Sequence, residues 1–319
     1  MDGHDTEICV IGAGMAGLAC ATALMRAGRA VRVIDKGRGP GGRMAARRAE
    51  IAGETVSFDH GAQYFTARDE GFKTMVSDWI ETGVVAPWPA AGEDCFVGVP
   101  GMNGPIRAMA QNCDVDWGVR ATSLSRASGR WVVETDQGAI RADHVLAAIP
   151  VEQARELIAE AAPDLSSILA KVASEPCWTA MAAFADRLDL PDVVRGDEGQ
   201  DPIAWAARNS GKPQRRGTEC WVIQASHTRS REIIDLSKDE AGPKLVDDFF
   251  KQTGGAAQTP MHLAAHRWLY SKPDAVEGDA ARYDAEACIG IAGDYLHSPR
   301  VEGAWISGRT LAQKVVSAV

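Results

Sequence analysis

Long hydrophobic runs, paired cysteines and blocks of basic residues are all missing from this 319-residue chain. No apolar stretch approaches the ~20 residues that a membrane-spanning helix needs. The first residues, Met1-Asp2-Gly3-His4-Asp5, lack the basic and then apolar pattern of a secretory signal. We therefore expect a cytoplasmic protein without a membrane partner.

The charge and cysteine content exclude further classes. Lys and Arg number 34 against 43 Asp and Glu, which gives a formal net charge of −9. Because phosphate contacts dominate nucleic-acid affinity, an acidic chain without a basic block is not expected to bind nucleic acid. The 7 cysteines are scattered and form no C-x-x-C pair, so the sequence predicts neither a metal site nor a disulfide framework.

The first forty residues carry the clearest pattern. An apolar strand over 7–11 runs directly into Gly12-Ala13-Gly14-Met15-Ala16-Gly17, an Ala- and Leu-rich helix follows over 18–27, and a second strand over 30–34 ends on Asp35. The first glycine allows a tight turn, the second lets backbone approach a pyrophosphate, and the third lets the helix pack on the sheet. The helix N-terminus offers N–H groups to phosphate, and Asp35 is placed to bind an adenosine ribose. This unit predicts a dinucleotide site, for NAD or for FAD.

Two further segments favour FAD. Residues 37–44 (GRGPGGRM) resemble the second part of the FAD fingerprint of the amine oxidase and desaturase superfamily, where paired glycines and an arginine run beside the diphosphate. Residues 290–294 (GIAGD) end a predicted strand before residues 301–308 open the last helix. In that superfamily such a Gly-Asp pair holds the ribityl and pyrophosphate portion, and the helix points its N-terminus at the flavin ring. Two glycine motifs more than 240 residues apart thus fit one ligand.

The other predicted elements define the fold class. We expect α/β plus α+β architecture, in which a Rossmann-like FAD-binding domain (1–66, 100–150 and 285–319) is interleaved with a substrate domain (67–99 and 151–284) that is mainly an antiparallel sheet with helices. Strands are predicted at 130–135, 139–141, 143–149, 178–185, 203–207, 220–225, 261–271 and 287–293, with a three-residue hairpin loop at 136–138, helices at 151–162, 243–252 and 306–318, and loops at 191–201 and 209–217.

Three inner stretches resemble the renalase family in its bacterial form: residues 58–66 (FDHGAQYFT), 205–213 (WAARNSGKP) and 266–271 (HRWLYS). This resemblance implies a flavoprotein that oxidises dihydronicotinamide dinucleotides carrying the extra hydride at ring position 2 or 6. The hydride passes to the flavin and then to O2, giving NAD(P)+ and H2O2. No cysteine stands beside Gly293-Asp294 or Gly303-Ala304, so we expect non-covalent FAD. With the fingerprints, the predicted cofactor contacts are Gly12, Ala13, Gly14, Met15, Ala16, Gly17, Asp35, Lys36, Gly42, Arg43, Met44, His60, Gly61, Ala62, Gln63, Ala121, Gly293, Asp294, Glu302, Gly303, Ala304 and Ser307.

Such a reaction needs few catalytic groups, because a dihydronicotinamide that loses hydride regains an aromatic ring without a strong base. If 58–64 is extended, Tyr64 lies on one face with His60 and can wall the substrate cavity, while Gln63 can bond a flavin edge. By the same alternation, His266 and Trp268 share one face of their strand. We predict Tyr64, His266 and Trp268 as catalytic and, with Asn209, as substrate contacts; core packing is the alternative for the aromatic residues.

Other functions stay open at this point. The same superfamily contains amine and polyamine oxidases, which need an aromatic cage for a neutral amine and acids that attract cations. A non-catalytic or electron-carrying flavoprotein and desaturase-like chemistry are further alternatives. The expected partners are a small dinucleotide and O2, and the sequence leaves the oligomeric state open.

Overall fold

Strand β1 (Asp5–Ile11) lies inside an eight-stranded sheet. Its residues from Ile8 onward are apolar and buried, as expected for a strand covered on both faces. The computed structural model describes residues 5–215 and 217–318. The strand path is β16-β17-β10-β1-β2-β7, in which β1 pairs in parallel with β2 and β10. Strands β8 and β9 extend the sheet through antiparallel pairing of β9 with β10. The bounds are β2 (Val31–Asp35), β7 (Val115–Trp117), β8 (Ala121–Ala127), β9 (Arg130–Thr135), β10 (Gly138–Ala147), β16 (Ala281–Asp284) and β17 (Ile289–Ala292).

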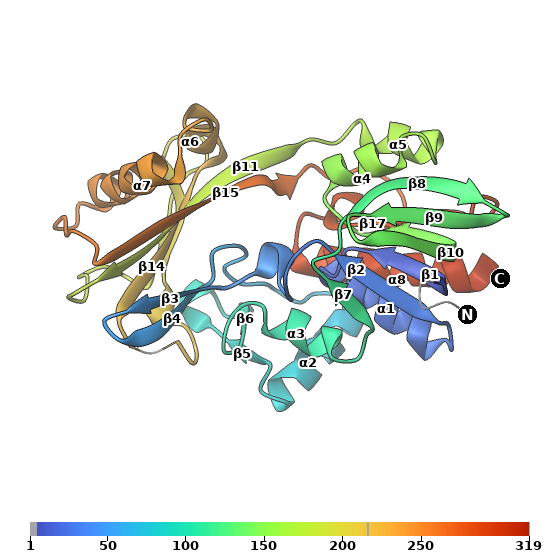
Figure 1. Cartoon of the computed structure of the whole chain (residues 1–319). Coiled ribbons are helices and arrows are strands. Elements are labelled where there is room, and N and C mark those ends of the chain that lie inside the picture. The colour runs from blue at the N-terminus through green and yellow to red at the C-terminus, as the bar shows by residue number, and fades with distance from the viewer. Residues whose placement is uncertain (1–4, 216, 319) are drawn as a thin grey trace.

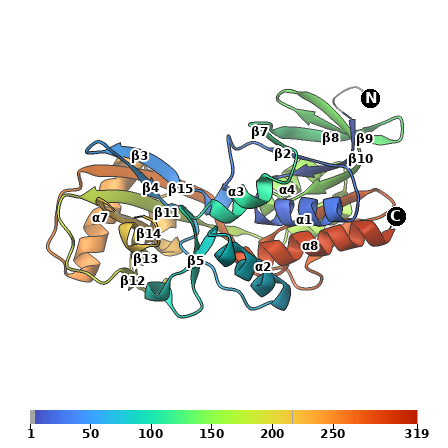
Figure 2. The same cartoon turned by 90° about the horizontal axis from the view of Figure 1, so that it is seen from below.

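Helices cover both faces of this sheet (Figure 1). On one face, α1 (Met15–Arg26) and α8 (Val301–Ala318) lie side by side, as the rotated view shows (Figure 2), and their apolar residues share one core cluster. On the other face, α4 (Val151–Ile158) and α5 (Pro163–Leu169) pack in a second cluster. This is the layered arrangement expected of a Rossmann-like domain.

A second, antiparallel sheet of five strands has the order β12-β13-β14-β11-β15. Helix α7 (Lys238–Thr253) packs on one face of it, and the hairpin β3–β4 packs on the other. Strands β11 and β15 are long and reach toward the first sheet (Figure 1). The bounds are β3 (Arg47–Ile51), β4 (Glu54–Phe58), β11 (Ser174–Phe184), β12 (Val193–Arg195), β13 (Ile203–Arg208), β14 (Glu219–Ala225), β15 (His262–Pro273) and α6 (His227–Glu232).

Helix α2 (Glu70–Glu81), which follows the β3–β4 hairpin in the chain, packs against α8. Phe72 and Trp79 of α2 share a core cluster with Trp305 of α8. The hairpin β3–β4, by contrast, shares its cluster with the antiparallel sheet. The division into 1–66, 100–150 and 285–319 against 67–99 and 151–284 stays a proposal. The remaining elements are α3 (Gly104–Ala110), β5 (Val85–Pro87), β6 (Phe96–Gly98) and the short 3-10 turns η1 (Gly42–Met44), η2 (Pro89–Ala91), η3 (Asn209–Gly211) and η4 (Asp294–Leu296).

Several predicted elements differ from the structure. The strands expected at 139–141 and 143–149 are one strand, β10, and its turn to β9 has two residues rather than three. The loop expected at 191–201 contains β12. The helix expected over 151–162 ends at Ile158, and α8 begins at Val301, ahead of the expected position 306. The sequence did not predict β3 to β8, β16, α2, α3, α5 or α6. Within the described residues, no helix combines the length and apolarity needed to cross a membrane.

Candidate functional site

The glycines of the first motif divide into two that are packed and one that is open. Gly12 has φ +108°, and its N–H donates to the carbonyl of Ile34 at 2.8 Å. A β-carbon on Gly17 would collide with the carbonyl oxygen of Gly12. A β-carbon on Gly14 would meet nothing within 4 Å, although Gly14 is the N-cap of α1 and no side chain caps this helix. Open space beside an uncapped helix N-terminus fits a diphosphate.

The adenosine end of the predicted site gathers around Asp35. Its carboxylate accepts the N–H groups of Ala13 at 2.7 Å and Gly37 at 2.6 Å, which fixes the glycine turn against the end of β2. The chain that enters β8 at Ala121 runs beside it, since Val119 donates to the carbonyl of Asp35 at 2.9 Å. The Lys36 ammonium donates to the side chain of Gln153 at 2.8 Å, on α4.

The second and third FAD motifs meet through one ion pair. The Arg43 guanidinium bonds both carboxylate oxygens of Asp294, at 2.9 and 2.6 Å. Burial opposes the charge of Arg43, but the charge and hydrogen bonds of Asp294 outweigh it and raise the pKa of Arg43. Arg43 is predicted to offset phosphate charge and Asp294 to hold the ribityl portion. In the structure the two side chains pair with each other, and their contacts with FAD stay a proposal. Gly42 (φ +54°) lies beside Gly14, whose Cα is 4.0 Å from the position of a β-carbon on Gly42.

A hydrogen bond joins the residue that follows β17 to the last helix, α8. The N–H of Gly293 donates to the buried hydroxyl of Ser307 at 2.8 Å. The carboxylate of Glu302 accepts the N–H groups of Arg68 at 2.6 Å and Asp69 at 2.7 Å, so this side chain orders the start of α2. A β-carbon on Gly303 would collide with the carbonyl oxygen of Ser298. The start of α8 can therefore bind a ligand through its backbone groups, because the Glu302 carboxylate is bonded to the start of α2.

Three predicted site residues form one aromatic cluster. The ring centroids of His60 and Trp268 lie 5.1 Å apart, those of His60 and His266 5.0 Å, and those of His266 and Trp268 4.4 Å. The Trp268 indole donates to the carbonyl of His60 at 2.8 Å. The cluster borders the FAD motifs, because Ala62 donates to the carbonyl of Arg43 at 2.8 Å. A β-carbon on Gly61 would lie 3.4 Å from the Trp268 ring.

The imidazoles of this cluster are neutral near pH 7. Burial, followed by the charges of His266 and Arg47, lowers the pKa of His60 to about 4. Burial, followed by the charges of Lys238 and Arg47, lowers the pKa of His266 to about 4. The buried Nδ1 of His60 has no hydrogen-bond partner among the described residues. Tyr64 packs on another ring of the antiparallel sheet, since its centroid is 5.2 Å from that of Trp205, and its predicted role stays a proposal.

The segment after Phe58 is not a strand, contrary to the extended conformation considered for 58–64. Asp59, Lys212 and Arg215 form a buried charge cluster, with the Asp59 carboxylate 3.2 Å from Lys212 and 2.8 Å from Arg215. The Gln63 amide lies inside the same loop, where it donates to the carbonyl of Gly61 at 3.0 Å and accepts from Lys212 at 3.1 Å. Its side chain therefore supports the loop instead of a flavin edge.

The predicted substrate contact Asn209 also has a supporting role. Its amide donates to the carbonyl of Ser57 at 2.6 Å and accepts the N–H of Asp59 at 3.2 Å, and the residue is 1% exposed. The Asn209 side chain therefore links η3 to the end of β4, and its predicted contact with substrate stays a proposal. Sequence reasoning missed Asp59, Lys212 and Arg215. Asp59 and Lys212 stand inside the motifs FDHGAQYFT and WAARNSGKP, and their charge was a signal, whereas Arg215 lies just beyond the second motif. Burial lowers the pKa of Lys212 to about 8.

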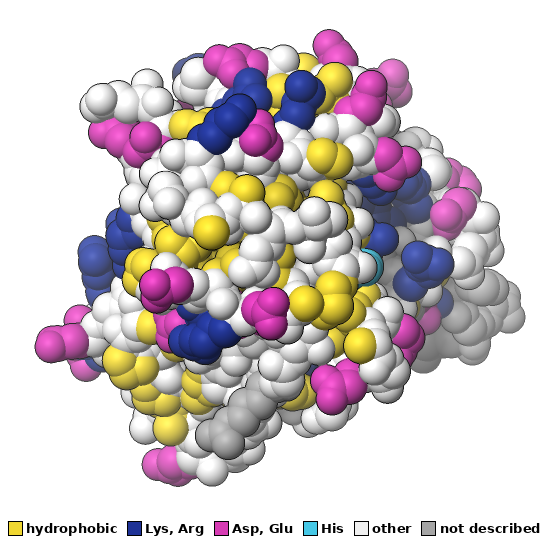
Figure 3. All heavy atoms as spheres, turned by 90° about the vertical axis from the view of Figure 1, so that its left-hand side faces the viewer, with side chains coloured by type: hydrophobic (Ala, Val, Ile, Leu, Met, Phe, Trp, Pro, Cys, Tyr) yellow, Lys and Arg dark blue, Asp and Glu magenta, His cyan; other side chains and the backbone are white. Residues whose placement is uncertain are grey.

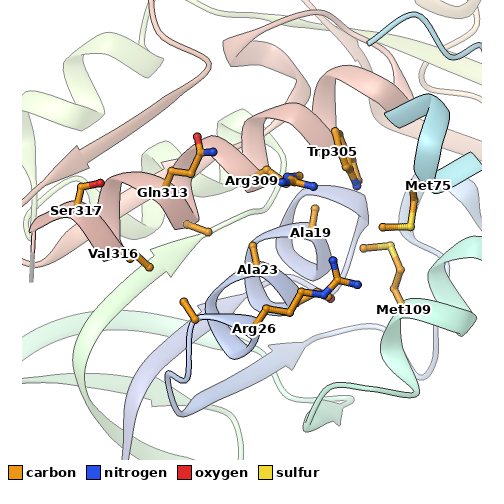
Figure 4. Close-up of a pocket in the computed structure, with 13 residues that line it drawn as sticks. Ala19, Ala23, Arg26, Met75, Met109, Trp305, Arg309, Gln313, Val316 and Ser317 are labelled. Carbon is orange, nitrogen blue, oxygen red and sulfur yellow. The ribbon is translucent and has the colours of Figure 1, made fainter. Parts of the chain in front are cut away.

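Two surface cavities lie away from these residues. One, of about 310 Å³, opens between α1 and α8, where Arg26 and Arg309 flank Ala19, Ala23 and Trp305 (Figure 4). The other, of about 460 Å³, lies between α7 and the chain that leads into β15. Neither is lined by a predicted site residue. In the part of the chain that the structure describes, no group of three or more His, Cys, Asp or Glu residues is arranged to hold a metal ion.

Known proteins match this chain over nearly its full length. A family model described as an NAD(P)-binding Rossmann-like domain matches residues 10–79, and one described as flavin containing amine oxidoreductase matches residues 87–316. Among solved structures, a protein assigned as a protoporphyrinogen oxidase from Exiguobacterium sp. 255-15 is 13% identical with a TM-score of 0.75, covering 99% of each chain. Putrescine oxidase bound to putrescine is 13% identical with a TM-score of 0.71, covering 98% of this chain and 99% of that one. These identities show the fold alone. The match over 87–316 shows more: the chain belongs to the flavin containing amine oxidoreductases, and its cofactor is FAD.

Proposed function

We propose that this chain is a renalase-like oxidase, which takes hydride from 2- or 6-dihydronicotinamide dinucleotides and gives NAD(P)+ and H2O2. The residues present fit FAD, because the open side of Gly14 borders both an uncapped helix N-terminus and the second glycine motif. In the proposal, the Gly12–Gly17 turn holds the diphosphate, Asp35 the ribose, and the backbone at Gly61 and at the start of α8 the ring end. Bound FAD supplies the hydride acceptor and the route of electrons to O2. We propose that it is held without a covalent bond.

The observation that carries the proposal is the neutral aromatic cluster beside the FAD motifs. His60, His266 and Trp268 offer flat surfaces against which a nicotinamide ring can lie, and the pKa of each histidine near 4 leaves it uncharged. No carboxylate pairs with either imidazole in the described structure. Hydride loss from a dihydronicotinamide needs orientation and exclusion of water rather than a base.

The charges that act on His266 favour an anionic dinucleotide over a protonated amine, whereas Asp59 acts with the opposite sign on His60. After burial, the groups that act on His266 are Lys238 and Arg47, and both are positive. A protonated amine would be repelled there, whereas the phosphates of a dinucleotide would be attracted. The likeness to putrescine oxidase keeps amine oxidation as the second candidate, although at 13% identity it speaks for the fold.

The test is anaerobic mixing of the FAD-bound enzyme with separate electron donors in a stopped-flow spectrometer. We expect the visible flavin absorbance to bleach within seconds with 2- and 6-dihydro-NAD, and to persist with putrescine and other primary amines. Ordinary 4-dihydro-NAD is the matched control because it differs only in the position of the hydride. Bleaching by amines alone would establish an amine oxidase. Bleaching by neither class would favour a flavoprotein that carries electrons for a partner.

A further inference from the structure

The basic residue Arg47 lies on the face of the β3–β4 hairpin that packs against the five-stranded antiparallel sheet. It begins β3 and lies opposite Phe58 in the β3–β4 pairing, so the two side chains point to the same face of the hairpin. That face also carries Ile51, and both Ile51 and Phe58 pack against residues of β11 and β14. The neighbouring Arg48 points to the opposite face by strand alternation. Both arginines are exposed.

This face leads to the aromatic cluster. The Phe58 ring stacks on His262 with centroids 5.8 Å apart, and His262 shares one face of β15 with His266. The charge of Arg47 acts on His60, His262 and His266 alike, which places it within electrostatic reach of the whole row. Figure 3 shows this end of the molecule, where basic and acidic side chains are scattered over the surface.

Arg47 has no anionic partner within the described structure. Some other arginines near the two sheets are held in ion pairs, such as Arg43 with Asp294 and Arg229 with Asp248. What distinguishes Arg47 from other arginines that are unpaired among the described residues, such as Arg48, is its position on the hairpin face that leads to the aromatic cluster. Guanidinium groups bind phosphate oxygens through two parallel N–H bonds, which no other side chain reproduces.

We propose that Arg47 binds the diphosphate of the dinucleotide substrate while the nicotinamide lies at His60, His266 and Trp268. This inference rests on the proposed function and deepens it, because it makes the enzyme selective for dinucleotides over phosphate-free dihydronicotinamides. Lys238, the first residue of α7, is a second positive charge that acts on His266. The chemistry at the ring is unaffected by this contact, so binding changes and the limiting rate does not.

The experiment compares Arg47→Ala with the matched control Arg48→Ala, both as FAD-bound enzymes with an unchanged flavin spectrum. In anaerobic reduction by 6-dihydro-NAD, we expect Arg47→Ala to raise the apparent dissociation constant about tenfold, since it removes a charged hydrogen bond. The limiting rate stays within about twofold, and Arg48→Ala matches the wild type. With 6-dihydro-1-methylnicotinamide, which lacks phosphate, all three proteins behave alike. Calorimetric binding of NAD+ gives the same order without turnover, and Arg47→Lys recovers part of the affinity.

The outcomes separate two failures. If 6-dihydro-NAD bleaches the wild type but Arg47→Ala binds NAD+ and 6-dihydro-NAD as the wild type does, the Arg47 inference is overturned and the proposed function stands. The inference is also overturned if Arg47→Ala weakens the phosphate-free donor to the same extent. If no dihydronicotinamide bleaches the wild type, the proposed function fails, and the assignment of Arg47 fails with it.

Discussion

Replacing Gly14 by Val separates folding from FAD binding. Gly14 has φ −80° and ψ −173°, an extended conformation open to any residue, and its added side chain meets nothing within 4 Å. As an N-cap, valine costs the protein about 1 kcal/mol of stability at most relative to glycine. The side chain instead fills the space at the start of α1 that we assign to the diphosphate.

The expected loss of FAD affinity follows from the displaced hydrogen bonds. The first N–H groups of α1, at Met15 and Ala16, have no intrahelical acceptor and no capping side chain. A hydrogen bond to a charged group contributes about 1.5–3 kcal/mol, so losing two of them costs about 3–6 kcal/mol. This corresponds to about 10²- to 10⁴-fold weaker binding.

The assay measures the flavin content of the purified variant and the dissociation constant of added FAD, with FAD-stripped wild type as the stability reference. We expect a colourless protein whose thermal midpoint lies within about 4 °C of that reference. Gly17→Val is the contrasting variant, because its β-carbon collides with the carbonyl of Gly12, and we expect it to misfold. A yellow Gly14→Val protein with one FAD per chain would refute the placement of the diphosphate.

Three further predictions concern the pH dependence, the ion pair and the attachment of FAD. Because the pKa of His60 and of His266 in the folded protein is about 4, against 6.5 in the unfolded chain, the unfolded state binds more protons in between. Chemical denaturation should therefore show a free energy of unfolding that decreases as the pH falls from 6.5 toward 4. The limiting rate of flavin reduction should stay constant from about pH 5 to about pH 8. A rate that rises with pH would indicate a required base. Asp294→Asn breaks the pair with Arg43 and should lower the free energy of unfolding in urea by about 3 kcal/mol. The control Asp279→Asn removes an exposed pair with Lys314 and should leave that free energy almost unchanged. Equal effects of the two variants would contradict a structural role for the Arg43 pair. Acid precipitation should release all FAD into the supernatant, since Cys288 lies before β17 and its thiol contacts the carbonyl of Ala285; flavin retained in the pellet would show covalent attachment.

The parts of the fold that are set by local sequence were predictable. The turn at Gly12–Gly17 and the strands on either side depend on residues that are close in the chain, so pattern and spacing identify them. The break expected within β10 came from Arg141 and Asp143. Both are exposed at alternate positions while Ile140 and Ala142 are buried, so the strand continues through them. Strand β12 is only three residues long, too short to give a periodic signal.

Contacts between distant segments decide the conformation of several predicted site residues, and the sequence did not predict these contacts. Asp59 is held by Lys212 and Arg215, about 150 residues away, which turns the chain out of β4 and directs Gln63 inward. No local alternation contains that information. The pairing of Arg43 with Asp294 spans 251 residues, and a fingerprint that treats each motif separately assigns both side chains to the ligand.

The central claim is that the flavin of this protein is reduced by a dihydronicotinamide whose extra hydride is at ring position 2 or 6. A single anaerobic turnover tests it most directly, with enzyme and 6-dihydro-NAD mixed in equal amounts and the products separated. The account predicts one NAD+ formed for each flavin bleached, and no flavin bleached by an equal amount of putrescine. A flavin that stays oxidised with 6-dihydro-NAD and bleaches with the amine, yielding an aldehyde and ammonia, would contradict it.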